Sequence, residues 1–338
     1  MKKIISILLT LLLIFGLTAC GNVTNESSAP AKNDTTKEAL SNIECDVFAI
    51  KGPTGIGLAP LMKKVDDGKG ALKYKINLVG SNEEIVAKFA STEADIAAVA
   101  TNVAALLNKS TASGVTVLAV NTLGVLALVT KGEEITSIQD LKGKTVYSTG
   151  QGANPEYIAK YILEKNGLTV GTDVNLEFVT EPTELVQKVV ANEKAIVIAP
   201  QPVATSITIK DQNAKIVFDL NDEWDKVSDT KLVMGCIIVR NEFLLDYPQA
   251  VEQFMKDYKE SIETVNNDVD TTAALCESYG IVSPAAIAKK AIPYCNIVFQ
   301  TGKEMKTNLS AYLKFLLDRK PMSVGGSLPA DSFYYEAN

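Results

Sequence analysis

The sequence contains no histidine. Histidine is the commonest general base and one of the commonest metal ligands, so its absence excludes Ser-His-Asp hydrolysis, Cys-His proteolysis and histidine-rich capture of zinc or manganese in their usual forms. Pairs of carboxylates remain formally able to do acid–base chemistry. Aspartate and glutamate, however, occur mostly in predicted first helical turns and on polar faces, and no pair stands out. We therefore predict no catalytic residue, no metal site and no cofactor.

Arginine and tryptophan are also scarce. Arg240 and Arg319 are the only arginines, and neither stands in a glycine-bearing loop, so those loops lack the bidentate clamp that suits carboxylate or sulfonate groups. Lys51 offers a point charge but is more typical of a solvated strand end. Trp224, the only tryptophan, lies beyond a predicted strand, which favours a packing or surface role over stacking on a ligand; Tyr147 is the other stacking candidate. A heteroaromatic molecule and a small oxyanion thus remain competing ligand classes.

Positive charge is not in excess. The chain has 33 basic and 40 acidic side chains and a formal charge of −7. Two of the basic residues lie in residues 1–19, so the rest of the chain carries 31 against 40. Because binding to nucleic acid needs a basic face that neutralises phosphates, we predict no nucleic-acid partner.

Long apolar runs are confined to the amino end. Lys2 and Lys3 precede an apolar run over residues 4–17, and Leu17-Thr18-Ala19-Cys20 ends it. The run is too short to span a bilayer as a helix of about 20 residues and is typical of an export signal. The Leu-Thr-Ala-Cys pattern resembles the bacterial lipobox, in which the cysteine is acylated. An ordinary secretory signal with an incidental Cys20 is the alternative.

The residues after Cys20 are poor in large apolar side chains and rich in Ser, Thr, Asn, Pro and Ala. Such a composition cannot bury enough surface to fold. We predict a signal peptide over residues 1–19 and a lipid-anchored flexible tether over residues 20–44. Four further cysteines follow, and in an exported protein they permit two disulfides in three pairings, or buried free thiols; the sequence does not choose. They are Cys45, Cys236, Cys276 and Cys295.

Apolar strand-like segments alternate with helix-like periods along the rest of the chain. Strands are predicted near residues 46–51, 74–80, 94–100, 115–121, 125–131, 145–149, 174–179, 195–199, 215–220, 231–240 and 296–300. Helices separate most of them, and the stretch after residue 240 is mainly helical. This alternation predicts an α/β fold with parallel-rich sheets.

Several short motifs together carry a family resemblance. They are the Gly-Pro-Thr-Gly loop after the first strand, Gly80-Ser81-Asn82-Glu83-Glu84, Ala94-Asp95-Ile96-Ala97, Asp140-Leu141-Lys142-Gly143-Lys144, and Ser148-Thr149-Gly150-Gln151-Gly152. In this order they resemble the substrate-binding proteins of ABC transporters with the periplasmic-binding-protein type 2 fold, near the nitrate/sulfonate/taurine and thiamine-precursor branch. The resemblance spans about residues 45–335.

The resemblance implies two α/β lobes joined by two hinge strands, with a ligand held between them. Lobe one would comprise residues 45–124 and 236–338, and residues 125–235 would form lobe two with the hinge strands. Closure of the lobes around the ligand would be a hinge motion.

Loops that leave the carboxyl ends of strands and enter helices present free N–H groups and the positive end of the helix dipole. Such loops suit an anion or a polar group, although they also occur as ordinary turns whose glycines serve conformation alone. The residues predicted to contact ligand are Thr54, Gly55, Ile56, Ala100, Thr101, Thr149, Gly150, Gln151, Gly152, Ala153, Asn154 and Gln201.

We expect a non-enzymatic, monomeric receptor for a small polar or anionic molecule, sulfonate-, nitrate- or taurine-like or thiamine-precursor-like. Its partners would be an ABC permease with its ATPase, and its only membrane contact a lipid anchor at the outer face of the cell membrane. A sensor lipoprotein that presents ligand to a signalling receptor is one alternative. An enzyme on the same bilobal scaffold is another, disfavoured by the missing histidines.

Overall fold

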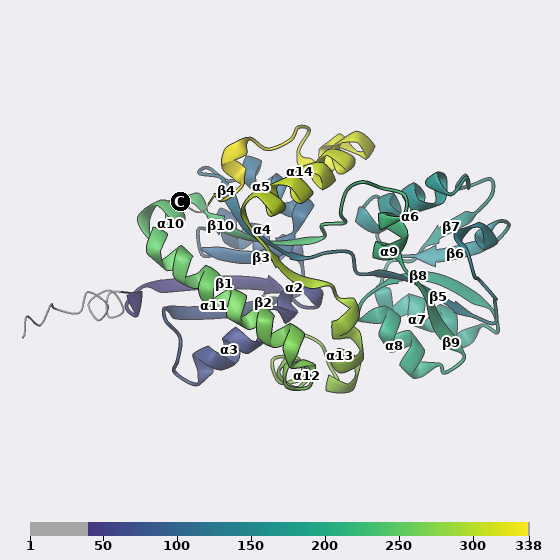
Figure 1. The fold of residues 1–338 in the computed structure, drawn as a ribbon, viewed down its shortest axis with the longest axis horizontal. Coiled ribbons are helices and arrows are strands. Elements are labelled where there is room, and N and C mark those ends of the chain that lie inside the picture. The colour runs from purple at the N-terminus through teal and green to yellow at the C-terminus, as the bar shows by residue number, and fades with distance from the viewer. Residues whose placement is uncertain (1–39, 337–338) are drawn as a thin grey trace, which may run out of the picture.

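The computed structural model describes residues 40–336, so the predicted signal peptide, Cys20 and most of the predicted tether lie outside the described residues. Figure 1 shows two lobes, each built on one β-sheet with helices packed against it. The α/β prediction is confirmed. No helix within residues 40–336 has the length and apolar character needed to span a bilayer.

Lobe one, on the left in Figure 1, holds a six-stranded sheet. Its order is β11 (Ile297–Gln300), β4 (Val115–Thr122), β10 (Gly235–Arg240), β3 (Ile96–Ala100), β1 (Glu44–Ile50) and β2 (Lys73–Val79). Its helices are α2 (Pro53–Ile56), α3 (Ala59–Asp66), α4 (Asn82–Ala90), α5 (Thr101–Ser110), α10 (Asn241–Asp246), α11 (Pro248–Asn267), α12 (Val269–Ser278), α13 (Ala285–Ala291) and α14 (Gly302–Arg319).

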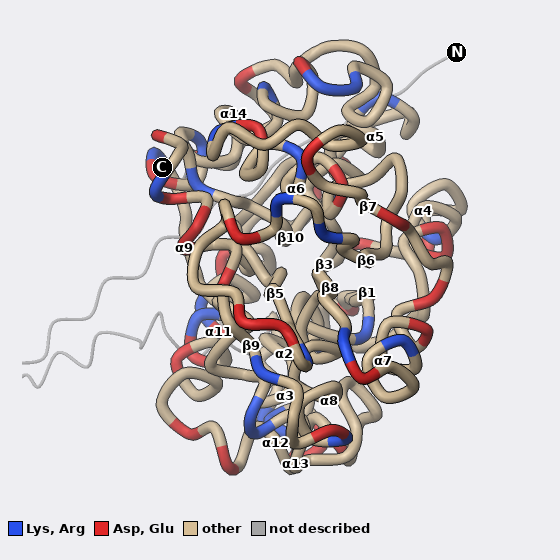
Figure 2. The backbone as a smooth tube through the Cα atoms, turned by 90° about the vertical axis from the view of Figure 1, so that its right-hand side faces the viewer, with Lys and Arg blue, Asp and Glu red and all other residues tan. Residues whose placement is uncertain are grey.

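Lobe two, on the right in Figure 1, holds a five-stranded sheet. Its order is β7 (Asn175–Phe178), β6 (Thr145–Ser148), β8 (Ala195–Pro200), β5 (Leu126–Lys131) and β9 (Ala214–Asp219). Its helices are α6 (Asn154–Lys165), α7 (Pro182–Ala191), α8 (Val203–Lys210) and α9 (Leu220–Asp225). Basic and acidic residues are interspersed along the tube when the molecule is seen from this side (Figure 2).

The sheets are mixed, so the prediction of parallel-rich sheets is wrong in this respect. Strands β1, β2 and β3 pair in parallel, as do β6, β7 and β8. Strands β10, β4 and β11 in lobe one, and β5 and β9 in lobe two, pair antiparallel. The cause is topological: the chain crosses between lobes after β4 and again before β10, and the crossing strands run against their neighbours.

The second crossing begins with an irregular segment. A strand was predicted from residue 231, but β10 begins only at Gly235, and residues 231–234 are not in a strand. The preceding backbone still bonds to lobe one: Met234 N donates to Thr122 O at 3.0 Å. Gly235 is required there for space, since a Cβ would lie 2.6 Å from Thr54 Cγ2 and 2.7 Å from Asn121 Oδ1. This crossing is thus packed tightly against the loop that follows β1.

Trp224 ties the two lobes together by packing. Its side chain is fully buried, its ring lies 4.6 Å from Tyr161 of α6 and 4.9 Å from Phe315 of α14, measured between centroids, and Tyr312 of α14 lies 6.4 Å away. Its Nε1 donates to Thr230 O at 2.5 Å. Aromatic edge contacts of this kind add to the free energy of burial. The only tryptophan is therefore a packing residue between the lobes.

All four described cysteines are buried free thiols. Burial raises the pKa of each thiol, to about 12 for Cys276. A thiol of raised pKa is a poor nucleophile and a poor metal ligand at neutral pH. Within residues 40–336, no three Cys, Asp or Glu side chains gather as they would around a metal ion.

Candidate functional site

The topology turns the predicted ligand loops of the two lobes toward one another. In lobe one, β1 and β3 are parallel neighbours, so the loops after residues 50 and 100 leave the same edge of the sheet. In lobe two, β6 and β8 are parallel neighbours, and their following loops share an edge likewise. The crossings leave and enter at these same edges, because Gly235 pairs with Ala100 and Leu126 pairs with Pro200. The crevice between the lobes is therefore the candidate site.

A buried polar side chain of β4 is hydrogen-bonded to the loop after β1. Asn121 Nδ2 donates to Thr54 O at 3.2 Å and to the hydroxyl of Tyr258 at 3.0 Å. Gly55 is required, because a Cβ there would lie 2.5 Å from Ile50 O. Gly55 and Ile56 are buried, whereas Thr54 is half-buried, so Thr54 is the predicted residue of this loop that a ligand can reach most easily.

The second lobe-one loop, which follows β3, is hydrogen-bonded to the second crossing between the lobes. Thr101 is fully buried, its N–H donates to Met234 O at 3.2 Å, and its hydroxyl donates to Val233 O at 2.7 Å. Ala100 N donates to Asn82 Oδ1 at 3.5 Å. The polar groups of Thr101 thus fix the second crossing against the sheet, and Ala100, half-buried, is the more accessible of the two predicted residues.

In lobe two, the glycine loop after β6 binds a carboxylate of its own. Gly152 N donates to Glu156 Oε2 at 2.6 Å, Ala153 N donates to Gly150 O at 3.0 Å, and the hydroxyl of Tyr157 donates to Gly152 O. Burial works to raise the pKa of Glu156, but the side chain of Lys160, the Gly152 N–H and the charge of Lys320 together lower it. Glu156 is therefore a stable anion at the start of α6.

Other polar groups of this loop stay unused. Among the described residues, we find no hydrogen-bond partner for the backbone N–H groups of Thr149, Gly150 and Gln151. The side chains of Thr149 and Asn154 are only 7% and 8% exposed and likewise make no side-chain hydrogen bond within the described part of the chain. Gly150 and Gly152 have φ of 73° and 74°, a conformation that favours glycine. The loop keeps donors available beside the one that Glu156 occupies.

Gln201 is the most unusual residue of the predicted set. It is 3% exposed, and its backbone N donates to Val125 O at 2.8 Å, at the first crossing. Its Oε1 accepts from Thr205 Oγ1 at 2.7 Å and from Thr205 N at 3.3 Å, which fixes the orientation of the amide. Its Nε2 is buried without a partner. Buried donors are rarely left unpaired, because each one costs about 1–3 kcal/mol.

Gln201 lines a cavity of about 210 Å³ formed by lobe two, to which lobe one contributes Tyr294 alone. Tyr294, which follows α13 in lobe one, lies beside the ends of β5 and β9 and is 49% exposed. Asp219 also lines it, and its Oδ1 accepts from Asn221 N at 2.8 Å. The full lining is Val125, Leu126, Ala127, Gln201, Ile216, Val217, Phe218, Asp219 and Tyr294.

Sequence reasoning missed Asp219 and Tyr294. Asp219 reads as an ordinary helix N-cap, which it also is, and Tyr294 stands in a helical stretch that carries no loop motif. Their proximity to Gln201 depends on how the lobes meet. Asp219 is the last residue of β9, and a strand was predicted there, so its position at the carboxyl end of a strand could have marked it as a candidate.

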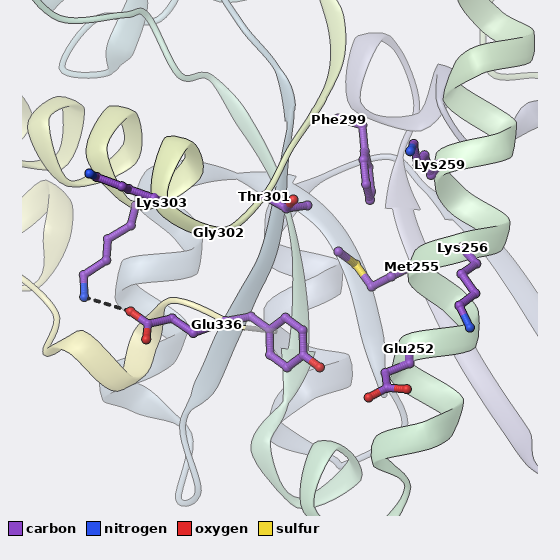
Figure 3. Close-up of a pocket in the computed structure, with 11 residues that line it drawn as sticks. Glu252, Met255, Lys256, Lys259, Phe299, Thr301, Gly302, Lys303 and Glu336 are labelled. Atoms are coloured by element: carbon purple, nitrogen blue, oxygen red, sulfur yellow. Dashed lines mark hydrogen bonds and ion pairs between the residues drawn. The ribbon is translucent and has the colours of Figure 1, made fainter. Parts of the chain in front are cut away.

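A larger cavity, about 840 Å³, lies away from these loops in lobe one. Figure 3 shows Met255 of α11 and Phe299 of β11 pointing into it, with charged side chains around its rim. Residues from lobe one alone line it, and none belongs to a strand-to-helix loop of the candidate site. A ligand there would not bridge the lobes, so we assign the candidate site to the crevice.

Comparison with known proteins identifies related sequences and folds. The chain matches the family described as "ABC transporter, phosphonate, periplasmic substrate-binding protein" over residues 59–274. No curated protein matches the sequence.

Solved structures share the fold. An ABC transporter protein from Parabacteroides distasonis superposes with a TM-score of 0.73 and 22% identity, covering 88% of this chain and all of that one. The periplasmic aliphatic sulphonate binding protein of Escherichia coli gives 0.68 and 12% identity, covering 88% and 97%. The alkanesulfonate-binding protein of Xanthomonas axonopodis bound to MOPS gives 0.60 and 12%, covering 82% and 93%. At these identities the similarity establishes the fold: two lobes of the periplasmic-binding-protein type.

Proposed function

This chain belongs to the phosphonate family of periplasmic substrate-binding proteins of ABC transporters, and from that premise we propose that it binds a small oxyanion-bearing molecule between its lobes. The family is described as one of substrate-binding proteins. The absence of histidine supports our proposal that this chain binds its ligand without transforming it. The substrate class and the residues that contact it are our inference from the crevice.

The observation that carries the proposal is the unpaired Nε2 of Gln201. Thr205 holds the other end of the same amide, so this N–H₂ group cannot turn away to find a partner. A hydrogen-bond acceptor on a ligand in the adjoining cavity would bond to this N–H₂ group and remove the free-energy penalty of leaving it unpaired. The free N–H groups of Thr149, Gly150 and Gln151 follow β6, the parallel neighbour of β8, and would supply further donors to a ligand that extends from the cavity to this loop.

The N–H donors of Gln201 and of the loop after β6 support a phosphonate or sulfonate over the other ligand classes predicted. Backbone and amide N–H groups bind such oxygens without an arginine clamp. Asp219 at the cavity adds an acceptor, which fits an amino or hydroxyl group elsewhere on the ligand, as in a taurine-like molecule. A thiamine-precursor-like pyrimidine is the competing ligand, because the side chain of Gln201 and Asp219 also pair well with ring nitrogens and an amino group.

A thermal-shift screen tests this proposal. Protein that has been unfolded, dialysed and refolded should be mixed with methylphosphonate, ethanesulfonate, taurine, MOPS, nitrate and an aminopyrimidine. A ligand at a hundred times its Kd adds about 2.7 kcal/mol to the free energy of unfolding, so the oxyanion group should raise the Tm by several degrees. A rise in Tm with the pyrimidine alone would mean that the ligand is a pyrimidine and not an oxyanion. No rise in Tm with any member of the panel would contradict the proposal.

The Asp219 carboxylate is expected to make stability depend on pH. Burial raises its pKa, with the Asn221 N–H opposing and Asp222 reinforcing the shift. The folded protein thus binds this proton more tightly than the unfolded chain does. The group's contribution to stability is therefore fully present below the unfolded pKa, about 3.9, and is lost as pH rises through the folded value.

Asp219→Asn is accordingly expected to raise the Tm at pH 7 and to lose that advantage as pH falls toward 4. Asn keeps an oxygen for the Asn221 N–H, so the comparison isolates the charge. Thermal unfolding of both proteins between pH 4 and 7 measures it. A Tm difference that does not change with pH would show that the carboxylate is not destabilised by burial.

We also propose that a lipid on Cys20 holds this receptor at the outer face of the membrane, where it acts as a monomer and delivers ligand to a permease with its ATPase. The lipobox-like residues 17–20 and the polar composition of the following segment support the anchor. With this tether of residues 20–44, the lobes would remain within tens of ångströms of the membrane. A sensor role would require a signalling receptor as partner in place of the permease.

A further inference from the structure

We propose that Lys320 of lobe one completes the oxyanion site on the glycine loop of lobe two, and so selects anionic ligands. The inference rests on the proposed function, because it concerns the same crevice. Lys320 supplies a positive charge that the glycine-bearing loops lack. It directly follows α14, and no sequence motif singled it out.

Lys320 is held in place by its backbone. Its N–H donates to Leu316 O at 2.8 Å, and its carbonyl accepts from Ser323 N and from Ser323 Oγ, at 2.8 and 2.7 Å. The segment after α14 therefore has a fixed course, while the ammonium group is exposed and forms no ion pair with a described carboxylate at salt-bridge distance.

The neighbouring arginine docks this end of α14 onto lobe two. Arg319 Nη2 lies 2.9 Å from Glu164 Oε2, and its Nη1 lies 3.3 Å from Glu164 Oε1, so the pair is bidentate. Its guanidinium carbon also lies 5.4 Å from the centre of the Tyr161 ring and 5.6 Å from that of Phe315. Arg319 is engaged by α6, whereas Lys320 has no ion-pair partner among residues 40–336.

The ammonium group of Lys320 reaches the loop. A Cβ placed on Gly152 would lie 3.5 Å from Lys320 Nζ, with no other described atom within 4 Å apart from those of Gly152 and its chain neighbours. The charge of Lys320 also helps to lower the pKa of Glu156, whose carboxylate accepts from Gly152 N. A cation of lobe one thus sits beside the loop of lobe two at its exposed glycine.

Two mostly buried side chains of the same loop add polar groups that a ligand could contact. The side chains of Thr149 and Asn154 are more than nine-tenths buried and make no side-chain hydrogen bond within residues 40–336. The three free backbone N–H groups of residues 149–151 lie in the same loop. An oxyanion bound there would take these donors from lobe two and the ammonium group from lobe one. Because it would contact both lobes, it would favour the closed arrangement.

The rival explanation is that Lys320 only pairs with Glu156 and steadies the junction of the lobes. Under that explanation its replacement would change stability, and the effect would vanish once Glu156 is neutralised. Under our proposal its replacement changes ligand affinity, and the change persists without the Glu156 charge. The two explanations therefore separate in a double-mutant cycle.

The experiment is calorimetric titration of the refolded protein with methylphosphonate, ethanesulfonate and inorganic phosphate, at low and at physiological ionic strength. Lys320→Gln is expected to raise the Kd for the oxyanion that binds wild type about tenfold at low salt, and to weaken the salt dependence. Lys320→Arg should recover most of the affinity. Lys303→Gln, at the other end of α14, removes a lysine that has no ion-pair partner among the described residues and should leave the Kd unchanged.

The outcomes separate the two proposals. Wild-type binding with an unchanged Kd in Lys320→Gln would overturn the inference about Lys320 and leave the proposed function standing. A tenfold loss that disappears in the Glu156→Gln background would also overturn it, in favour of the ion pair. No binding of any probe by wild type would overturn both. A loss that persists in Glu156→Gln, with recovery by arginine, supports direct contact with the ligand.

Discussion

Replacing Trp224 with alanine is expected to lower the free energy of unfolding by roughly 3–5 kcal/mol. The side chain is fully buried against Tyr161 of lobe two and Phe315 of lobe one, so its removal leaves a cavity between the lobes. The lost indole would also strand Thr230 O, which now accepts from Nε1. Urea unfolding followed by circular dichroism measures the change, because the variant has no tryptophan left to report by fluorescence.

Two controls make the Trp224 result specific. Trp224→Phe keeps an aromatic ring and should lose clearly less stability than the alanine variant. Tyr247→Ala, at an aromatic residue that is 44% exposed, should change the free energy of unfolding by less than about 1 kcal/mol. A loss of that small size for Trp224→Ala would mean that the aromatic cluster does not hold the lobes together.

Replacing Gln201 with glutamate is expected to raise the Kd for the oxyanion ligand about a hundredfold, which corresponds to about 2.7 kcal/mol. The carboxylate can keep the hydrogen bonds from Thr205, since Oε1 is the acceptor in both residues. It loses the unpaired Nε2 donor and puts a negative charge beside the ligand. Calorimetric titration with the panel member that binds wild type measures the change.

Gln212→Glu is the matched control for that experiment. It makes the same change of charge on an exposed loop of lobe two, so the Kd should stay within about twofold of wild type. Gln201→Met, which removes both ends of the amide without adding charge, should fall between the two. Equal affinity in wild type and Gln201→Glu would remove Gln201 from the site.

The sequence was sufficient to predict which loops leave the sheet edges that carry the crossings between lobes. Each predicted loop follows a strand that is recognisable from its apolar run, such as residues 94–100, and precedes a helix marked by its first-turn residues. Because carboxyl ends of neighbouring parallel strands share one edge, local patterns alone bring residues 52–57 near 100–101, and 149–154 near 201. That the two lobes face one another across a crevice was implied by the family resemblance and not by the local patterns.

Other features of the site depend on contacts that local patterns do not encode. Thr101 resembles a free helix start, but its hydroxyl bonds to Val233, which lies far along the chain. Glu156 resembles a first-turn acid, and only the fold shows that it occupies the Gly152 N–H. Lys320 and Tyr294 reach lobe two from helical parts of lobe one, so their roles follow from the docking of α14 and α13.

The antiparallel strands illustrate the same limit. The apolar runs that form β5 and β10 are as continuous as those of the parallel strands, so periodicity alone does not show their direction. Their direction follows from the two crossings, which are a property of the whole chain.

The most direct test of the central claim is hydrogen–deuterium exchange with and without the small molecule that raises the Tm. Binding between the lobes predicts slower exchange in the loops of both lobes, residues 52–57 and 149–154, together with the segment after α14. Protection confined to one lobe, or centred on the lobe-one cavity around Met255 and Phe299, would contradict a ligand site in the crevice.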